Sequence, residues 1–305
     1  MGIHGPDRGS RVVLVTGATT GIGAALAGLL VQTNYRVVLT ARASSMDRFE
    51  GMKLPCSERL LLRPLDVANQ QQAADLVEEI DGRWGGVDIL VNNAGVCYRS
   101  VMEHAARDEE NHQFQVNYFG PMGLVRLVLP GMRAKRGGHI INLSSVGGMM
   151  AMPTMGLYSA SKFALEGASE ALWYELKPWG IKVTLVEPGF VHSSSFKNVL
   201  YSTLARSSLE DSSSPYHCYY VHLTTFIERM MCLSPTTPEH IAAKIIRILG
   251  SKRPPLRVSA TWDAVVFSMM RRVLPQRIYH QLLYLGLPRV KSWVPNEEEC
   301  RASST

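Results

Sequence analysis

The chain has 305 residues, of which 46% are hydrophobic and 19% charged, which is enough for one large α/β domain with a buried core. Its five cysteines are scattered and lack any Cys-x-x-Cys spacing, and its histidines show no ligand spacing, which excludes a disulfide framework and indicates no metal site. The first ten residues lack the apolar stretch of a signal peptide, and no run approaches about 18 apolar residues, so we expect a cytoplasmic protein without a spanning helix.

Strand-like and helix-like segments alternate along the chain. Apolar runs predict strands at 12–15, 36–40, 60–65, 87–92, 139–144 and 181–187. Apolar residues at helical spacing predict helices after Ile22 and over 69–81, 111–133 and 157–177. Apolar strands joined by crossover helices predict a doubly wound, mostly parallel sheet with helices on both faces, which is a Rossmann-type α/β fold. A serine-rich patch at 207–214 predicts a flexible excursion from a single domain.

A glycine-rich turn, Thr16-Gly17-Ala18-Thr19-Thr20-Gly21-Ile22-Gly23, follows the first predicted strand. Gly17 permits a sharp turn, Gly21 lets a ligand approach the backbone, and Gly23 allows close packing of the next helix. The N-terminus of that helix offers free N–H groups and a positive dipole end to a pyrophosphate. The spacing differs from the usual Gly-x-Gly-x-x-Gly, so a glycine turn that serves packing alone remains the alternative.

The end of the second strand indicates which dinucleotide the chain prefers. A dinucleotide fold usually places an acid there, on the ribose hydroxyls of adenosine. This chain has Ala41 followed by Arg42, and a guanidinium suits a 2′-phosphate. We therefore expect NADP(H) as the cofactor, the alternative being that Arg42 is an ordinary exposed arginine.

Tyr158 and Lys162 lie one helical turn apart in the predicted helix 157–177, so they share a face. An ammonium near a phenol favours the phenolate, whose reference pKa is about 10, and this makes a tyrosine usable as an acid or base at neutral pH. Ser145 precedes this pair by 13 residues. A tyrosine and a lysine on an ordinary amphipathic helix would give the same spacing. The other motifs therefore decide whether this pair is catalytic.

Seven motifs occur in one order along the chain. They are Thr16 to Gly23, Asp66-Val67, Asn92-Asn93-Ala94-Gly95, Phe114-Gln115-Val116-Asn117, Ile141-Asn142-Leu143-Ser144-Ser145, Tyr158-x-x-x-Lys162 and Pro188-Gly189. With these motifs the chain resembles the short-chain dehydrogenase/reductase family over residues 10–195. Three segments, 162–167, Val186-Glu187-Pro188-Gly189 and 252–257, are similar to its hydroxysteroid and retinol dehydrogenase branch.

The resemblance implies a role for each matching residue. Tyr158 exchanges the substrate proton, Lys162 lowers the tyrosine pKa and holds the nicotinamide ribose, and Ser145, rather than Ser144, binds the substrate oxygen. Asn117 anchors a water that links Lys162 to solvent. The implied cofactor contacts are Gly17, Thr19, Thr20, Gly21, Ile22, Gly23, Arg42, Asp66, Val67, Asn93, Ala94, Gly95, Tyr158, Lys162, Pro188, Gly189, Val191 and Ser193. Ser193 stands where relatives often have a threonine.

The substrate class is inferred from residues near the implied pocket. Four methionines, Met149, Met150, Met152 and Met155, separate the catalytic serine from the tyrosine and suit either an adaptable apolar pocket or core packing. The resemblance implies a substrate-covering excursion over 193–235, which contains Phe196, Leu200 and Tyr201. We expect the substrate to be a small molecule, namely a bulky hydrophobic alcohol or ketone such as a steroid, a retinoid or another lipid.

The C-terminal segment is basic and amphipathic. Between Arg247 and Lys291 there are nine Lys or Arg residues and one acid, Asp263, interleaved with apolar residues. We expect a catalytic domain over 1–258 and an extension over 259–305 that Pro275 breaks in two. Its apolar face contacts either a membrane surface through 259–291 or the domain or a partner copy. Nucleic-acid binding is not expected, because no recognition motif accompanies the basic residues.

These observations lead to an NADP(H)-dependent oxidoreductase that interconverts a hydroxyl and a carbonyl group. We also expect a homo-oligomer. The alternative is a non-catalytic nucleotide-sensing or scaffold protein on the same fold. The presence of Asn117, Ser145, Tyr158 and Lys162 together favours the enzyme, because a protein without activity is free to lose them.

Overall fold

A computed structural model describes residues 10–193 and 198–294. Its centre is a seven-stranded parallel sheet in the order β3-β2-β1-β4-β6-β7-β9. These strands are β1 (Val12–Val15), β2 (Arg36–Ala41), β3 (Leu60–Pro64), β4 (Ile89–Asn92), β6 (Gly138–Leu143), β7 (Ile181–Glu187) and β9 (Arg257–Ser259). The predicted doubly wound parallel fold is confirmed. The chain order reverses between β1 and β4, which is where such sheets bind ligands.

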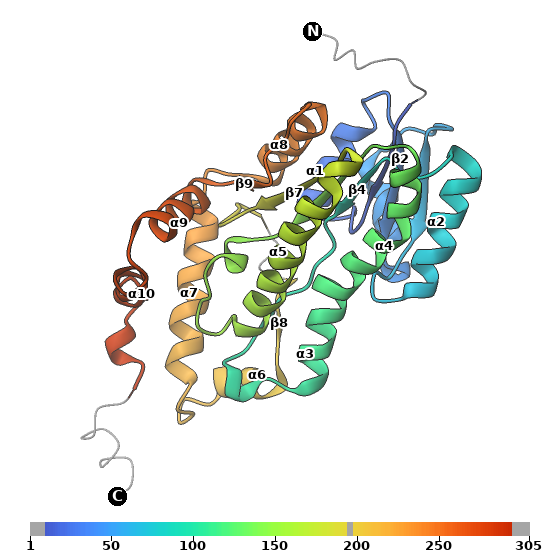
Figure 1. Cartoon of the computed structure of the whole chain (residues 1–305). Coiled ribbons are helices and arrows are strands. Elements are labelled where there is room, and N and C mark those ends of the chain that lie inside the picture. Colours follow the sequence, from blue (N-terminus) through green and yellow to red (C-terminus); the bar gives the residue numbers. More distant parts are fainter. Residues whose placement is uncertain (1–9, 194–197, 295–305) are drawn as a thin grey trace, which may run out of the picture.

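Helices cover both faces of the sheet (Figure 1). One face packs against α2 (Gln70–Trp84), α4 (Gly120–Ala134) and α5 (Gly156–Leu176), whose Ile80, Leu124 and Leu165 enter the core. The other face packs against α1 (Gly21–Leu30) and α8 (Pro238–Gly250), which contribute Leu26, Leu30, Ile241 and Ile245. Because the strands are buried on both sides, they read as continuous apolar runs in the sequence.

The predicted helix 111–133 is interrupted in the structure. It consists of α3 (Arg107–Phe114), a π-helical turn η3 (Gln115–Phe119) and then α4. The predicted helical stretch is confirmed, with the difference that the π turn adds a residue to the helical period. Such turns are frequent at functional sites, and this one carries the buried Asn117.

The expected flexible excursion at 207–214 is wrong in its first half, because α6 (Thr203–Glu210) occupies it. The Ser202 hydroxyl caps this helix by accepting a hydrogen bond from Ala205 N, and Ala205 packs with Val101 and Tyr220. A second helix, α7 (His217–Leu233), follows, and a short strand β8 (Leu200–Tyr201) pairs with β5 (Tyr98–Arg99). Phe196 lies outside the described residues.

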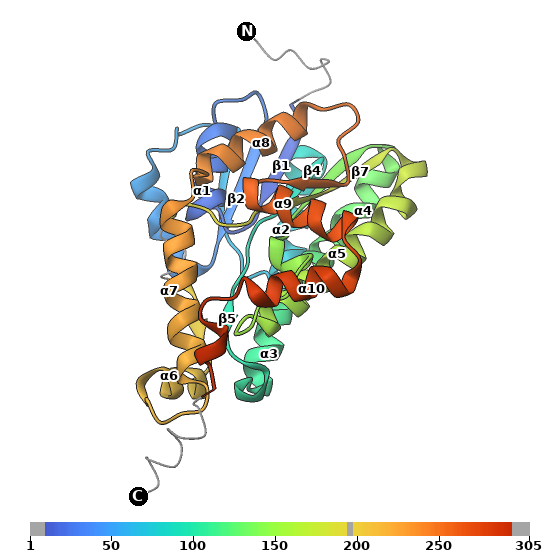
Figure 2. The same cartoon turned by 90° about the vertical axis from the view of Figure 1, so that its left-hand side faces the viewer.

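The C-terminal segment joins the sheet before it becomes helical. Strand β9 pairs with β7 through Ser259, so it spans the predicted domain boundary at 258. Beyond it, α9 (Trp262–Val273) and α10 (Gln276–Leu285) meet at Pro275, which confirms the predicted break. Figure 2 shows both helices on the side of the molecule that faces the viewer. Over residues 10–193 and 198–294, no helix is long and apolar enough to cross a membrane. Residues 295–305 of the predicted extension lie outside the described part.

Candidate active site

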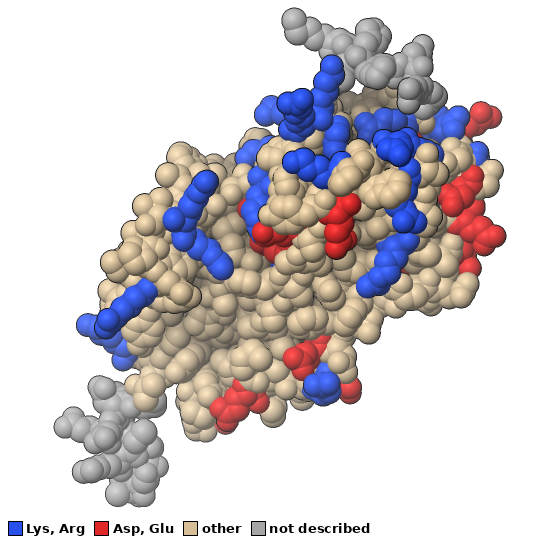
Figure 3. Space-filling model, viewed as in Figure 1, with Lys and Arg blue, Asp and Glu red and all other residues tan. Residues whose placement is uncertain are grey.

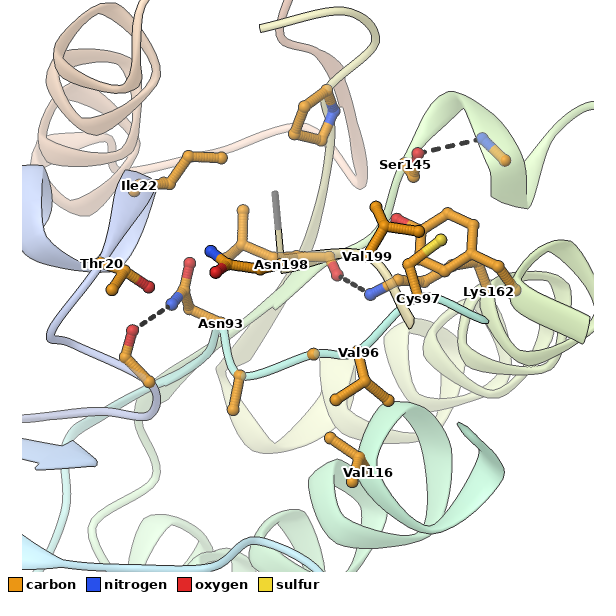
Figure 4. A pocket seen from close by; sticks show the side chains of 18 of the residues that line it. Thr20, Ile22, Asn93, Val96, Cys97, Val116, Ser145, Lys162, Asn198 and Val199 are labelled. Atoms are coloured by element: carbon orange, nitrogen blue, oxygen red, sulfur yellow. Dashed lines mark hydrogen bonds between the residues drawn. The ribbon is translucent and has the colours of Figure 1, made fainter. Parts of the chain in front are cut away.

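A cavity of about 700 Å³ opens at the carboxyl ends of the central strands. Figure 4 shows Thr20, Ile22 and Asn93 on one side of it and Ser145, Cys97 and Lys162 on the other, with Asn198 and Val199 between them. The lining residues come from the loops after β1, β2, β3, β4, β6 and β7, together with α5 and α7. The cavity therefore brings the glycine turn and the Tyr158–Lys162 pair into one site.

The glycine turn is held by close contacts that leave a helix end open. Gly17 has φ +66°, and an added Cβ would lie 2.9 Å from Ala94 Cα; at Gly23 it would lie 2.2 Å from the Gly17 carbonyl oxygen. The Asn93 amide donates to the carbonyls of Thr16 and Gly17 at 3.0 and 2.9 Å, which ties β4 to the turn.

The N-terminus of α1 fits a dinucleotide pyrophosphate. Thr20, the residue before the helix, makes no side-chain capping bond, so the first N–H groups of the helix point to the cavity without a competing side chain. Gly21 has φ +52°, and an added Cβ there would meet nothing within 4 Å. The open helix end together with this space forms a cradle for a phosphate group.

The far end of the cavity is basic on one side. Arg42 follows β2 and is exposed, and Ser45 and Arg48 line the same region. Asp66 and Val67, which follow β3, lie in the same lining. The sequence motifs did not indicate Ser45 or Arg48. The one available signal was their position just after Arg42, in the 3-10 segment η1 (Ala43–Met52).

Tyr158 and Lys162 lie in the first turns of α5 and both face the cavity. The Lys162 ammonium is 5.8 Å from the centroid of the Tyr158 ring and donates a 2.8 Å hydrogen bond to the Leu143 carbonyl. Lys162 is 5% exposed, and burial lowers the pKa of its ammonium to about 8. The charged form is disfavoured because it loses water.

Burial raises the pKa of the Tyr158 phenol above its ordinary value, the nearby Cys97 adds to the rise, and the hydrogen bond with Ser145 opposes it. Removal of the phenol from water dominates in the chain by itself, so the net shift is upward. The lowering expected from Lys162 stays a prediction. Tyr158 consequently keeps its proton at neutral pH, which suits an acid that donates to a developing alkoxide.

Two serines follow β6, and their surroundings distinguish them. Ser144 is buried and donates a 2.6 Å hydrogen bond to Glu166 Oε1. Ser145 is partly buried beside Tyr158, and its Oγ accepts a 3.1 Å bond from Gly147 N. The Ser145 hydroxyl therefore lies at the cavity beside Tyr158, whereas that of Ser144 is committed to a structural bond.

Asn117 lies behind the cavity wall, in the π turn. Its side chain accepts from Val96 N at 2.9 Å and donates to Val96 O and to Ser161 Oγ at 2.9 and 3.0 Å. A Cβ added to Gly95 would lie 3.3 Å from Asn117 Oδ1 and 3.8 Å from Lys162 Nζ, so the two residues approach each other there. The water relay implied for Asn117 stays a prediction.

The Pro188-Gly189 loop is fixed by the C-terminal segment. Gly189 N donates to Thr261 Oγ1 at 2.8 Å, and Phe190 N donates to Asp263 Oδ2 at 2.9 Å. A Cβ on Gly189 would lie 1.8 Å from Asp263 Oδ2, which leaves no room for a side chain. Asp263, the one acid between Arg247 and Lys291, therefore points towards the site and fixes this loop.

The cavity is lined by all the predicted site residues except Gly23 and Asn117. Met150, Met152 and Met155 also line it, whereas Met149 does not. Residues that sequence reasoning missed are Cys97, Arg99, His112, Asn198, Ile227 and Met231. They lie on or beside β5, on α3, before β8 and on α7, and none of them belongs to one of the seven motifs. In the part of the chain that the structure describes, no cluster of three or more His, Cys, Asp or Glu side chains could hold a metal.

Comparison with known proteins agrees with this geometry. The family model described as short chain dehydrogenase matches residues 11–202. The chain belongs to this family. A 3-ketodihydrosphingosine reductase of Bacteroides thetaiotaomicron is 33% identical over 274 residues, which are 90% of this chain and 96% of that protein. Retinol dehydrogenase 8 of Bos taurus is 34% identical over 81% of this chain and 80% of its own length.

Solved structures of the family share the fold. A short-chain dehydrogenase from Streptomyces avermitilis has a TM-score of 0.75 and 30% identity, covering 91% of this chain and 96% of that one. A serine dehydrogenase complexed with NADP+ has a TM-score of 0.65 and 25% identity, covering 81% and 92%. This short-chain dehydrogenase is accordingly an oxidoreductase that acts on CH–OH groups with a nicotinamide dinucleotide.

Proposed function

We propose that this short-chain dehydrogenase is an NADP(H)-dependent enzyme that interconverts a hydroxyl and a carbonyl group on a bulky hydrophobic substrate. One observation carries the proposal: Tyr158, Ser145 and Lys162 line the same cavity as the open N-terminus of α1. A dinucleotide on the helix end and a substrate beside the tyrosine would therefore share one chamber.

The chain's own groups position and protonate the substrate. The bound cofactor supplies or accepts the hydride. During reduction, the Ser145 hydroxyl donates a hydrogen bond to the substrate oxygen, on which negative charge develops. Tyr158 transfers its proton to that oxygen, and Lys162 stabilises the phenolate that remains. The raised pKa of Tyr158 favours this direction, because the phenol begins the cycle protonated.

Two arginines support the choice of NADP(H). Arg42 and Arg48 line the cavity beyond β2, and Ala41 stands where an acid would repel a 2′-phosphate. Asp66 is the one carboxylate among the described lining residues, and it follows β3. Two guanidiniums beside the ribose position would clasp a phosphate with charge-assisted hydrogen bonds.

Apolar side chains support a bulky hydrophobic substrate. Met150, Met152 and Met155 line the cavity beside Tyr158, and Ile227 and Met231 of α7 line it as well. Flexible thioethers adapt to large apolar molecules. Two of the relatives carry the names of a sphingoid-base reductase and a retinol dehydrogenase, both of which act on lipids.

A screen of hydrophobic ketones and alcohols, followed by NADPH absorbance, tests the proposal. Tyr158→Phe keeps the ring and removes the transferable proton, so turnover should fall at least about a hundredfold while NADPH still binds. If the Phe variant turns over substrate as fast as the wild type, the role of Tyr158 is refuted. NADPH binding with no turnover of any hydroxyl or carbonyl compound would favour the non-catalytic, nucleotide-sensing alternative.

We also propose that α9 and α10 dock on an anionic membrane surface. Four exposed apolar residues of α9, Trp262, Val266, Met269 and Val273, recur at intervals of three and four and form one solvent-facing stripe. Ile278, Leu282 and Leu285 form a second stripe on α10. A helix that turns its apolar stripe away from the core presents it to a partner.

The charge around these stripes favours a lipid surface. Residues 264–294 contain five Lys or Arg and no acid: Arg271, Arg272, Arg277, Arg289 and Lys291. Figure 3 shows the region of α9 and α10, on the left, with blue side chains among tan ones. A second cavity of about 720 Å³ lies beside α10, and Met150 lines both this cavity and the active-site cavity.

Vesicle sedimentation tests membrane docking. Cutting after Arg257 would remove part of β9, so exposed residues make better variants. Arg272→Gln with Arg277→Gln should weaken binding to vesicles of anionic lipid by about thirtyfold, at about 1 kcal/mol per charge. Lys53→Gln with Arg59→Gln, both exposed before β3, is the matched control and should bind like the wild type. Failure of the wild type to sediment at low salt would exclude the membrane role.

We further propose a homo-oligomer. Phe119, which ends η3 before α4, and Tyr174 of α5 are 45% and 62% exposed. A second copy could cover them. Sedimentation velocity measures the state directly, and a monomer at micromolar concentration would refute this.

A further inference from the structure

Arg99 is a buried arginine in the wall of the active-site cavity. It ends the short strand β5 and is 4% exposed, yet it belongs to the cavity lining. Its Nη1 donates to Tyr201 Oη and to Thr224 Oγ1, both at 3.3 Å, and its Nε has no hydrogen-bond partner in the described chain. The guanidinium is thus held by two neutral hydroxyls and remains incompletely satisfied.

No carboxylate neutralises this charge. Among residues 10–193 and 198–294, no Asp or Glu forms an ion pair with Arg99 within 4.0 Å. The one acid in the described lining, Asp66, belongs to the adenosine end beyond β3. A buried charge without a counterion is costly, and evolution tolerates such a cost chiefly where a ligand brings the opposite charge.

Arg99 lies on the substrate side of the cavity. It is two residues beyond Cys97, and both residues line the cavity. Cys97 lies beside Tyr158 and Lys162, and both Arg99 and Lys162 favour its thiolate, although burial raises the pKa of Cys97 to about 12. The phosphates of a dinucleotide are already matched by α1 and by Arg42 and Arg48, so they do not account for Arg99.

We infer that Arg99 binds a carboxylate on the substrate, so that the preferred substrate is a hydrophobic keto or hydroxy acid. This inference rests on the proposed function, because it deepens the substrate class of the same site. The apolar lining of Ile227 and Met231 contacts the hydrocarbon part of the molecule, while Arg99 fixes its acidic end several bonds from the reacting carbon. The distance between the guanidinium and Tyr158 then determines which carbon along the hydrocarbon chain of the substrate reacts.

A matched pair of substrates tests the inference. A long-chain keto acid and its methyl ester differ only in the charge at one end. The wild type should show kcat/KM about ten- to a hundredfold higher for the acid, the range for hydrogen bonds to a charged group. Arg99→Gln should abolish that preference, so that the variant turns over acid and ester with equal kcat/KM. Thr224→Val removes a neutral partner, keeps the charge and should retain the preference.

Equal kcat/KM for acid and ester in the wild type would overturn the inference. An equal fall in kcat/KM for acid and ester in a folded Arg99→Gln protein would also overturn it. A binding measurement on the wild type does not depend on any variant folding. With NADPH present, calorimetry should show that laurate binds more tightly than dodecanol and weakens as salt rises. No difference between them would also overturn the inference. Failure of the proposed function gives a different result. In that case neither the ester nor the acid is turned over, regardless of how tightly laurate binds.

Discussion

The Ser144 hydroxyl donates a 2.6 Å hydrogen bond to the carboxylate of Glu166, four residues beyond Lys162 on α5. Glu166 in turn pairs with Arg257 of β9, which also contacts Glu187 at 2.9 Å and Glu170 at 3.0 Å. The three segments that are similar to the hydroxysteroid and retinol dehydrogenase branch thus meet in one ion cluster. It holds the residue before Ser145 against the catalytic helix.

Arg257→Met should destabilise the protein by about 1–3 kcal/mol, less than the cost of breaking a fully buried ion pair, because the Arg257 side chain is 39% exposed. Glu166 and Glu187 are 6% and 2% exposed, so their charges would be left without compensation in the interior. Urea unfolding measures the loss. The matched control is Glu170→Gln, because Glu170 is 47% exposed and its pair with Arg257 should contribute little. Similar stability of wild type and Arg257→Met would contradict this role.

Gly147→Ala should lower kcat by about tenfold or more without unfolding the protein. The added Cβ would lie 2.9 Å from Cε1 of Tyr158, so the ring has to shift from its position. A displacement of about 1 Å in a catalytic group can cost about a hundredfold in rate. The control is Gly167→Ala on α5, where an added Cβ meets nothing within 4 Å. Equal kcat in Gly147→Ala and wild type would show that the tyrosine position is not limiting.

Ala41→Asp with Arg42→Leu should erode or reverse the preference for NADPH. We expect the wild type to bind NADPH more tightly than NADH by about 1–3 kcal/mol, the range for charge-assisted contacts. The Asp would repel a 2′-phosphate and accept bonds from ribose hydroxyls instead. Fluorescence titration with both cofactors measures the ratio, and Arg48→Leu shows whether the second guanidinium contributes. Equal wild-type affinities for the two cofactors would contradict the assignment.

His139 should make the protein less stable as the pH falls. It is 1% exposed, bonds to Thr184 Oγ1 at 3.0 Å, and burial lowers its pKa from 6.5 to about 3. Between those values the unfolded chain binds a proton that the folded chain does not, so stability is complete above pH 6.5 and declines towards pH 3 by about 1.4 kcal/mol per unit. His139→Gln keeps a partner for Thr184 and should flatten this slope in urea titrations from pH 7 to 4. If the slope is the same in His139→Gln as in the wild type, the pH dependence of stability comes from other titrating groups.

Local patterns predicted most of the sheet and most of the cavity lining. The apolar runs located β1 and β7 at their observed bounds because buried parallel strands leave an unmixed apolar signal. Strand β9 escaped because it has only three residues and follows Pro254 and Pro255, and the π turn at Asn117 escaped because one extra residue barely changes a helical period. Arg99 escaped because its setting depends on Tyr201 and Thr224, which are more than 100 residues away.

The late position of β9 and α8 in the chain has a consequence during synthesis. The matched family region ends at residue 202, yet Val186 pairs with Val258, and Leu26 and Leu30 share their core with Ile241 and Ile245. A nascent chain that has left the ribosome only as far as α7 therefore carries a sheet in which β7 lacks its partner β9 and one apolar face is covered by α1 without α8. Such surfaces attract chaperones and aggregate when exposed for long. Emergence of α8 and β9 is thus the step at which the sheet can be completed.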